Sequence, residues 1–332
     1  MQAPLARLKR PSALYRMLGD RVFVVVVTLL ALGIVALSLG LGYYLYLGGA
    51  QAIERFGFWG FLTGTTWDPA LKEEFGAWPY LVGTLLTSFC ALFLSLFPAI
   101  AAAIYAAEYA PKWLVGIINY LVDLMAAVPS VVYGIWGIFV LAPFLRENLF
   151  LPAYLWTAEH APGILPYLGN PSGYGFFTAV VILASMIIPY TTALARDAIS
   201  LVPQAQREAA YALGATRWEV MRLAMLPYAR GGILAGVILA LGRALGETMA
   251  VAMVIGNTNI MLKLLGIPLL YPLFGPATTM PSVIALEFKE AVTDIHLSSL
   301  IALGFYLFLV AFVVNLLASY LINVFKVGGQ RA

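Results

Sequence analysis

Charged residues are scarce in this chain of 332 residues. Only 11% are Asp, Glu, Lys or Arg, whereas 62% are apolar. A typical soluble domain has about 25% charged and roughly 45–50% apolar residues. Such a chain cannot cover its surface with polar groups in water, so the composition excludes a soluble enzyme or nucleic-acid-binding protein as the ordinary interpretation. It predicts an all-α membrane protein that crosses the bilayer several times.

Cysteine and histidine are nearly absent. Cys90 is the single cysteine and lies in an apolar run, so the chain can form no internal disulfide. The two histidines, His160 and His296, are far apart in the sequence, which argues against a zinc site made of histidine. The net charge of +3 is too small to indicate a nucleic-acid partner. We therefore expect no metal, no cofactor and no nucleic acid bound by this chain.

Six apolar runs are long enough to cross a bilayer, which needs about 20 residues of helix. They cover residues 22–47, 79–106, 113–145, 173–194, 231–256 and 296–325. The third run is too long for one simple span. Asn119 and Asp123 indicate an amphipathic or buried approach segment before a span that begins near Pro129. The first run exceeds the roughly 7–15 apolar residues of a signal peptide, so we interpret it as an uncleaved transmembrane helix.

Lys and Arg are unevenly distributed between the two sides of the membrane. With the N-terminus in the cytoplasm, thirteen of the 19 Lys and Arg residues lie on the cytoplasmic side and five on the other, while Arg243 lies within a span. Positive charges favour the cytoplasmic side. The sequence therefore predicts both termini in the cytoplasm, with residues 1–21 as an N-terminal segment and 326–332 as a tail.

Three longer segments connect the spans on the external side. Residues 48–78 and 146–172 contain Trp, Tyr, Pro and Gly, and we expect packed caps or docking surfaces there, with packed caps the commoner case. The third segment, 257–295, contains four prolines followed by residues 282–287. We interpret that last piece as a short helix that dips back toward the membrane.

The cytoplasmic loop of residues 199–227 predicts two short helices joined by a glycine. A first helix is expected at 204–213, ended by Gly214, which can adopt a positive φ. Thr216 and Glu219 have the spacing of a capping box, in which both side chains satisfy backbone N–H groups at the start of a second helix. The loop is thus expected to form a rigid elbow at the cytoplasmic face.

The order of residues in this loop resembles the EAA signature of ABC-importer permeases. Glu-Ala-Ala at 208–210, Gly214 and Leu-Pro at 226–227 follow the family's order, while Ala224 replaces the usual Ile. Pro227 is expected to end the second helix. The resemblance implies that the elbow inserts into a groove of a separate ATPase subunit and transmits its opening and closing.

The fifth span contains two opposite charges, Arg243 and Glu247, four residues apart. In a continuous helix this spacing places both on one face within pairing reach. Burying an ion in hydrocarbon costs about 2.5–3.5 kcal/mol or more, so such residues face protein or water. Small residues at every fourth position from Gly236 to Gly256 let another helix approach closely. We therefore expect this span in the middle of the assembly.

Two interpretations of this charge pair remain open. The pair either neutralises itself and locks helix packing, or Arg243 presents its cation to an anionic substrate while Glu247 holds it or exchanges partners during transport. Arginine suits oxyanions because its guanidinium donates two parallel hydrogen bonds. The second interpretation is favoured, since ionisable residues inside a membrane are usually functional.

Three further segments give a more specific resemblance. They are residues 241–257, 128–134 and 284–291. They look like segments of the C-type permease subunit of bacterial phosphate ABC importers, in the family of binding-protein-dependent transport system inner membrane components. The likeness extends over about residues 22–325. The segment that best distinguishes phosphate permeases from sulfate, molybdate or metal permeases is Gly-Arg-Ala-Leu-Gly-Glu-Thr at 242–248. It implies a type I (MetI-like) permease core at 79–325 with an extra helix at 22–47.

The resemblance implies a multi-pass protein of the bacterial cytoplasmic membrane that forms half of the pathway of an ATP-driven importer for inorganic phosphate. The implied partners are a homologous second permease of the PstA type, two ATPase subunits of the PstB type and an external phosphate-binding protein of the PstS type. This chain has no Gly-x-x-x-x-Gly-Lys-Ser/Thr phosphate loop, so it is not expected to be an enzyme, and a partner must bind ATP.

The resemblance and the polar residues of the spans together define the expected sites. Arg243 and Glu247 match the family's transport-essential pair, and Thr248 and Ser130 are expected beside them on the substrate pathway. The residues expected at the ATPase subunits are Glu208, Ala209, Ala210 and Gly214.

Two alternatives remain open for the function. The chain is either a permease of the same type for another oxyanion, or an ATP-independent secondary transporter or channel. The Glu-Ala-Ala loop argues against the second alternative, because an ion-driven carrier needs no docking loop of that pattern.

Overall fold

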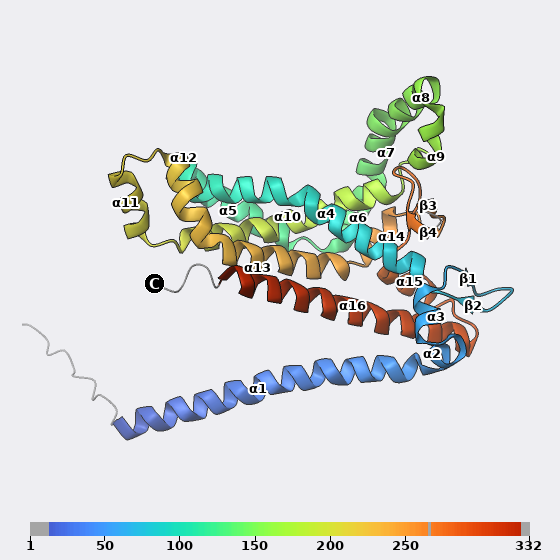
Figure 1. The fold of residues 1–332 in the computed structure, drawn as a ribbon, viewed down its shortest axis with the longest axis horizontal. Coiled ribbons are helices and arrows are strands. Elements are labelled where there is room, and N and C mark those ends of the chain that lie inside the picture. The colour runs from blue at the N-terminus through green and yellow to red at the C-terminus, as the bar shows by residue number, and fades with distance from the viewer. Residues whose placement is uncertain (1–12, 265–266, 327–332) are drawn as a thin grey trace, which may run out of the picture.

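The computed structural model describes residues 13–264 and 267–326, and its long helices run along one common axis (Figure 1). Six helical segments in this part of the chain are long and apolar enough to cross a membrane. They are Arg21–Gly48, Trp78–Tyr109, Ser130–His160, Phe176–Ser200, Arg217–Leu245 and Asp294–Tyr320. The strands in this part are short and form two antiparallel hairpins. The predicted all-α class and the number of spans are confirmed.

The N-terminal helix is largely separate from the other helices. Helix α1 (Ala13–Gly48) includes the predicted first span, and no residue of its most apolar window is buried. At its C-terminal end it approaches α16 (Asp294–Lys326), where a Cβ on Gly42 would come within 2.8 Å of the Phe308 ring. Toward its N-terminus α1 diverges from α16 (Figure 1). Residues 1–12 and nearly all of the predicted tail lie outside the described residues.

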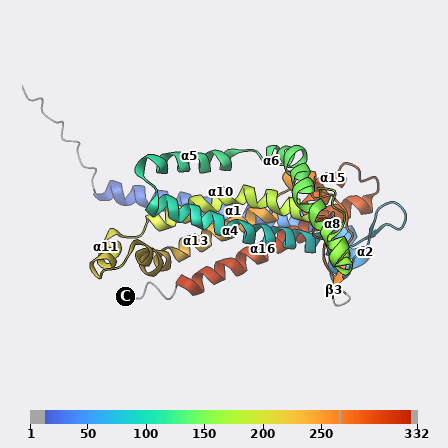
Figure 2. The same cartoon turned by 90° about the horizontal axis from the view of Figure 1, so that it is seen from above.

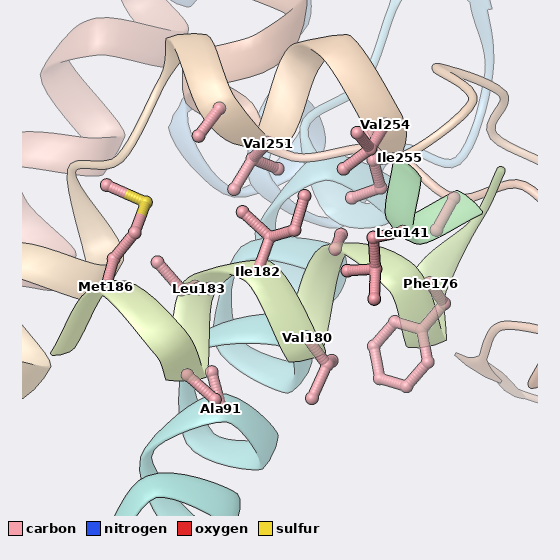
Figure 3. Packing of buried hydrophobic residues seen from close by; sticks show 14 of the residues in the cluster. Ala91, Leu141, Phe176, Val180, Ile182, Leu183, Met186, Val251, Val254 and Ile255 are labelled. Atoms are coloured by element: carbon pink, nitrogen blue, oxygen red, sulfur yellow. The ribbon is translucent and has the colours of Figure 1, made fainter. Parts of the chain in front are cut away.

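Three helices form the centre of the bundle. They are α4 (Trp78–Ile104), α10 (Phe176–Ser200) and α13 (Leu226–Leu245). Of the six spans, α10 has the largest buried share, because it packs against both α4 and α13. Figure 3 shows Ile182 and Leu183 of α10 between Ala91 of α4 and the segment that carries Val251. Burial of these aliphatic side chains among closely packed neighbours fixes the position of α10.

Of the small residues predicted to allow close helix packing, Gly236, Ala240 and Ala244 belong to α13, whereas Thr248, Ala252 and Gly256 lie beyond its end. A Cβ on Gly236 would come within 2.8 Å of the Leu194 Cβ, and one on Gly232 within 2.5 Å of the Ala198 Cβ. Ala240 is buried in the same direction. The expected close approach is therefore confirmed at Gly236, within α13, and the approaching helix belongs to this same chain.

The region around the third apolar run is divided into several helical segments, and they continue past residue 145 to His160, into the stretch predicted as an external connection. They are α5 (Lys112–Ala127), α6 (Ser130–Trp136), α7 (Ala142–Leu145) and α8 (Leu151–His160), with π-helical turns η1 (Tyr105–Tyr109) before α5, η2 (Gly137–Leu141) after α6 and η3 (Arg146–Phe150) after α7. Helices α5 and α6 follow one another along the bundle, whereas α8 projects from its end (Figure 1 and Figure 2). Pro129 explains the break between α5 and α6, because it has no N–H for a helical bond and favours extended backbone at Val128.

The predicted start of the third span near Pro129 agrees with the helix that begins at Ser130. Helix α5, predicted as an amphipathic or buried approach segment, has no buried residue and lies beside α10. Asn119 of α5 accepts a hydrogen bond from the Arg196 guanidinium of α10, while Asp123 is exposed. Asn119 therefore joins α5 to the bundle, whereas Asp123 does not take part in this contact.

Short elements pack together at the end of the bundle where the hairpins lie. They are α2 (Ala50–Phe56), α3 (Phe58–Thr63), β1 (Trp67–Asp68), β2 (Glu74–Phe75), β3 (Leu262–Leu264), β4 (Ile267–Leu270) and α15 (Met280–Glu287). The Phe61 ring stacks on the Tyr306 ring of α16, with centroids 5.5 Å apart, inside an aromatic cluster. The segment 48–78 is thus a packed cap, as the sequence predicted.

The remaining two predicted connections are also ordered. After α8, the short helices η4 (Pro162–Ile164) and α9 (Leu165–Leu168) return the chain to the bundle. Leu273 and Phe274 donate backbone hydrogen bonds to residues 167–168 of this return. The predicted short helix at 282–287 is confirmed as part of α15, whose first four residues are buried.

Candidate functional site

The span that carries Arg243 and Glu247 is interrupted between these two residues. Helix α13 ends at Leu245, and α14 (Met249–Val254) begins after three non-helical residues. Two side chains in the gap bond to nearby backbone groups: the Thr248 hydroxyl donates to the Gly246 carbonyl (3.1 Å), and Glu247 Oε1 accepts from the Ala250 N–H (3.3 Å). These local bonds compete with helical ones. The predicted continuous helix over 231–256 is therefore wrong.

Arg243 and Glu247 consequently do not form the predicted pair. The (i, i+4) contact requires an unbroken helix, and the break turns the two side chains toward different neighbours. No ion pair joins them within 4.0 Å, although both residues are among those that the structure describes. This geometry removes the interpretation in which the two charges simply neutralise each other.

The guanidinium of Arg243 lies over an aromatic ring. Its Cζ is 4.3 Å from the centre of the Tyr190 ring of α10, which is the geometry of a cation–π contact. The Arg243 residue is exposed, so its N–H donors are accessible from outside the chain. Sequence reasoning missed Tyr190, because a tyrosine in an apolar run gives no sign of the cation that it will support.

The position of the Tyr190 ring is fixed by a hydrogen bond to the end of α5, just before the break in the third span. Its hydroxyl donates to the Ala126 carbonyl (2.7 Å), and the Tyr133 hydroxyl donates to the Met125 carbonyl (3.0 Å). Carbonyls in the last turn of a helix lack internal partners, and Pro129 supplies no N–H beyond this turn. The end of α5 thus fixes the ring beneath Arg243, and a discontinuity in one span positions the charged residue of another.

The other two predicted pathway residues also lie at the breaks. Ser130 is the first residue of α6, Thr248 lies in the gap before α14, and both are half-buried. Helix α6 packs closely on α14: a Cβ on Gly134 would come within 3.2 Å of the Ala250 Cα. The two interrupted spans therefore adjoin, although no hydrogen bond among the described residues joins Ser130, Thr248, Arg243 or Glu247 to one another.

The 199–227 loop forms the predicted elbow. Helix α11 (Gln204–Ala212) is followed by Gly214, whose φ is +83°, and by α12 (Arg217–Glu219). The capping box is present: the Glu219 carboxylate accepts from the Thr216 N–H at 2.8 Å, and the Thr216 hydroxyl oxygen accepts from the Glu219 N–H at 3.4 Å. Glu208, Ala209 and Gly214 are exposed, and Ala210 is half-buried. The loop thus presents an accessible surface at the end of the bundle opposite the hairpins (Figure 1).

The sequence predicts that the second helix of the elbow ends at Pro227, and this prediction is wrong. After α12 the chain continues through a π-helical turn, η5 (Val220–Met225), directly into α13. Pro227 is the second residue of α13 and directly follows the π-helical turn, so the change in helical winding accommodates a residue that has no N–H to donate. The elbow is therefore continuous with the span that carries Arg243, so a displacement of α12 acts directly on that span.

An ion pair anchors α11 to η1, the π-helical turn that follows α4. The Arg207 guanidinium lies 3.1 Å from a Glu108 carboxylate oxygen and also donates to the Ile199 carbonyl at 3.1 Å. The Tyr211 hydroxyl donates to the other Glu108 oxygen at 3.3 Å. Partial removal from water, followed by the nearby Glu108 charge, raises the pKa of Tyr211, so its hydroxyl remains a donor. Sequence reasoning missed Glu108, since its partners are about 100 positions away.

Glu108→Ala is expected to loosen α11 without unfolding the spans. The Arg207–Glu108 pair is mostly shielded from water, so loss of the carboxylate leaves Arg207 poorly satisfied, at a cost of order 1–3 kcal/mol. Amide hydrogen exchange over residues 204–212 should accelerate several-fold, while exchange within α10 stays unchanged. Unaltered exchange in α11 would show that the ion pair does not anchor it.

A matched control is available at the opposite end of the bundle. Arg55 and Glu73 form an ion pair at 3.3 Å, but both side chains are substantially exposed. Exposed pairs contribute about 0–1 kcal/mol. Glu73→Ala should therefore leave exchange throughout α11 and thermal stability close to those of the unmodified protein.

Residues 99–325 match the family described as binding-protein-dependent transport system inner membrane component. The chain belongs to this family. Two curated relatives are called phosphate transport system permease protein PstC. That of Mesorhizobium japonicum is 41% identical over 96% of this chain and 95% of the relative. That of Haemophilus influenzae is 39% identical over 84% of this chain and 85% of the relative.

A solved structure shows the same fold as this permease. A chain of a bacterial ABC transporter involved in the import of the acidic polysaccharide alginate aligns with a TM-score of 0.57 at 18% identity, over 93% of this chain and 98% of that one. The permease is therefore a multi-pass inner-membrane component of a binding-protein-dependent transport system, and it has the fold of that solved transporter chain. It is a transport component of its family, as the sequence indicated.

Proposed function

We propose that this permease imports inorganic phosphate and forms half of the translocation pathway. The proposal is supported by the names of the relatives that are 41% and 39% identical to it. Its physical basis is Arg243, an exposed cation on a membrane span with no carboxylate partner among the described ion pairs. A guanidinium in this state has its N–H groups available for two parallel hydrogen bonds to an oxyanion.

Tyr190 gives Arg243 a role that differs from ion pairing. A cation–π contact stabilises the guanidinium from one face but leaves the N–H donors at its edge unoccupied. An adjacent carboxylate would instead compete with the substrate for those donors. We infer that Arg243 contacts phosphate transiently, with Glu247, Thr248 and Ser130 lining the same pathway at the two interrupted spans.

The second half of the pathway is assigned to a homologous permease, because the exposed face that carries Arg243 is not closed by this chain alone. The elbow at 199–227 is proposed to dock on ATPase subunits of the PstB type through Glu208, Ala209, Ala210 and Gly214. In this arrangement the elbow and both termini are cytoplasmic, the hairpins are external, and a phosphate-binding protein delivers substrate to the hairpin end.

Side-by-side transport assays test the choice of substrate. The complete complex, reconstituted with its ATPase subunits and binding protein, should import phosphate with ATP present and show little uptake of sulfate or molybdate. Preferred uptake of another oxyanion would retain the architecture and reject the substrate. Phosphate uptake without any ATPase subunit would reject ATP coupling and favour a secondary transporter or channel.

A further inference from the structure

A small cavity with a partly polar lining lies at the break in the Arg243 span, and Glu247 is one of the residues that line it. It is lined by residues of α4, α10, α13, α14 and the start of α15, and by Glu247 from the gap between α13 and α14. Five polar side chains line it: Thr84, Thr87, Ser88, Glu247 and Thr279. Its space for the centre of a water molecule is about 10 Å³. That is close to the roughly 10–15 Å³ needed to hold one water.

Two of these side chains already have partners. The Thr84 hydroxyl donates to the Tyr80 carbonyl (2.7 Å) and accepts from the Met280 N–H (2.9 Å). Thr279 caps α15, where its hydroxyl oxygen accepts from the Ser282 N–H. The polar groups that remain for anything inside the cavity are therefore the Thr87 and Ser88 hydroxyls and the Glu247 carboxylate.

The Thr87 hydroxyl is a buried polar group that needs a hydrogen-bond partner. The residue is 1% exposed, and its hydroxyl oxygen has no hydrogen-bond partner among the described residues. A buried hydroxyl without a partner costs roughly 1–3 kcal/mol in protein mutational data, and such groups are rare. Thr→Val removes this cost at nearly constant volume, so a purely apolar environment would have favoured Val here.

We propose that one water molecule in this cavity joins the Thr87 hydroxyl to the Glu247 carboxylate, which makes Thr87 a positioning residue for Glu247. The water has the two to four polar partners that a buried water needs, with Ser88 as the third. Glu247 then bonds to α4 through the water and to the Ala250 N–H of α14 directly. This arrangement holds the carboxylate away from Arg243, whose donors stay free for an anion.

Thr87→Val gives opposite results in the presence and absence of such a water. With the bridge, Val leaves the water and Glu247 short of a partner, so the apparent Tm of the purified complex should fall by about 2–4 °C. Without it, Val replaces an unsatisfied hydroxyl, and the Tm should stay the same or rise. An unchanged or raised Tm therefore overturns the proposal.

Two comparisons separate positioning from simple packing. Thr87→Ser keeps the hydroxyl and should behave closer to the unmodified protein than Thr87→Val. Thr157→Val is a matched control on α8, where the buried threonine hydroxyl already donates within its own helix to the Ala153 carbonyl. It should leave α14 unchanged. A Thr87→Ser variant that resembles Thr87→Val would overturn the assigned role of the hydroxyl.

Hydrogen exchange reports on Glu247 itself. In Thr87→Val the amides of residues 249–252 should exchange several-fold faster, because the carboxylate that caps α14 through Ala250 loses its orientation. In a Glu247→Gln background the added Thr87→Val change should have a much smaller effect on these amides and on the Tm. Additive effects of the two changes would overturn the bridge.

The transport consequence rests on the proposed function and is measured separately. Initial phosphate uptake should fall about threefold to tenfold in Thr87→Val, with recovery in Thr87→Ser and little change in Thr157→Val. The melting and exchange results do not depend on which solute is carried. A complex that imports no phosphate would reject the proposed substrate, whereas unchanged melting and exchange in Thr87→Val would reject the water bridge.

Discussion

Arg243→Gln is expected to reduce phosphate uptake by the complete complex by about 10–100-fold. Charge-assisted hydrogen bonds contribute roughly 1.5–3 kcal/mol, and each 1.4 kcal/mol corresponds to a tenfold change. Gln keeps polarity and part of the length but loses the positive charge and the paired N–H donors. Uptake of radiolabelled phosphate into proteoliposomes measures the loss, with ATP supplied to the nucleotide-binding side.

Assembly should survive this substitution. Arg243 is exposed and makes no ion pair with Glu247, so its removal leaves no buried charge without a partner. The amount of complex recovered should therefore match the unmodified protein, which separates lost transport from lost folding.

Arg243→Lys and Arg222→Gln complete the comparison. Lys retains the charge but not the planar pair of donors, so intermediate uptake is expected. Arg222 is an exposed arginine of η5, within the elbow and away from the pathway, so its loss should leave the apparent KM for phosphate unchanged. Wild-type uptake by Arg243→Gln would assign Arg243 to helix packing alone.

Gly214→Val is expected to uncouple ATP hydrolysis from import. Gly214 has a φ of +83°, which a β-branched residue reaches only with strain of order 1–3 kcal/mol. No atom lies within 4 Å of a Cβ built on this glycine, so the effect is on backbone conformation and not on crowding. Because α12 continues through η5 into α13, a displaced elbow should misplace the Arg243 span. Parallel assays of ATPase activity and phosphate uptake give the coupling ratio.

Gly214→Asn provides the matched control for backbone conformation. Asn adopts positive φ more readily than other non-glycine residues, so this variant should keep most of the coupling that Val loses. If Val and Asn fail equally, the surface of the elbow matters more than its backbone. Import and hydrolysis at wild-type rates in Gly214→Val would contradict the proposed transmission through the elbow.

Much of the fold follows from local patterns in the sequence. Each span needs only a run of apolar residues, and the elbow needs only Gly214 and the Thr216–Glu219 capping box within a few positions of each other. The small residues of α13 were likewise recognised from their spacing, because the fourth-residue repeat defines one helix face whatever lies opposite.

The candidate site could be predicted only in part. Hydropathy and the four-residue spacing both favour a continuous helix through Arg243 and Glu247. Neither pattern contains information about the hydrogen bonds that Glu247 and Thr248 make within the gap. The anchoring pair Arg207–Glu108 joins residues 99 positions apart, which no local pattern can identify.

The sequence by itself determined the membrane class, the number of spans, the elbow at residues 199–227 and the presence of a charged arginine in the fifth span. Apolar length, capping and glycine conformation are properties of neighbouring residues, so they can be recognised before folding. Only the tertiary structure decided the neighbours of the two charges: Tyr190 beneath Arg243, and Thr87 beside the cavity that Glu247 faces. Those neighbours come from α10 and α4, which are distant in the sequence. The break at residues 246–248 directs Arg243 toward Tyr190 and Glu247 toward the cavity beside Thr87.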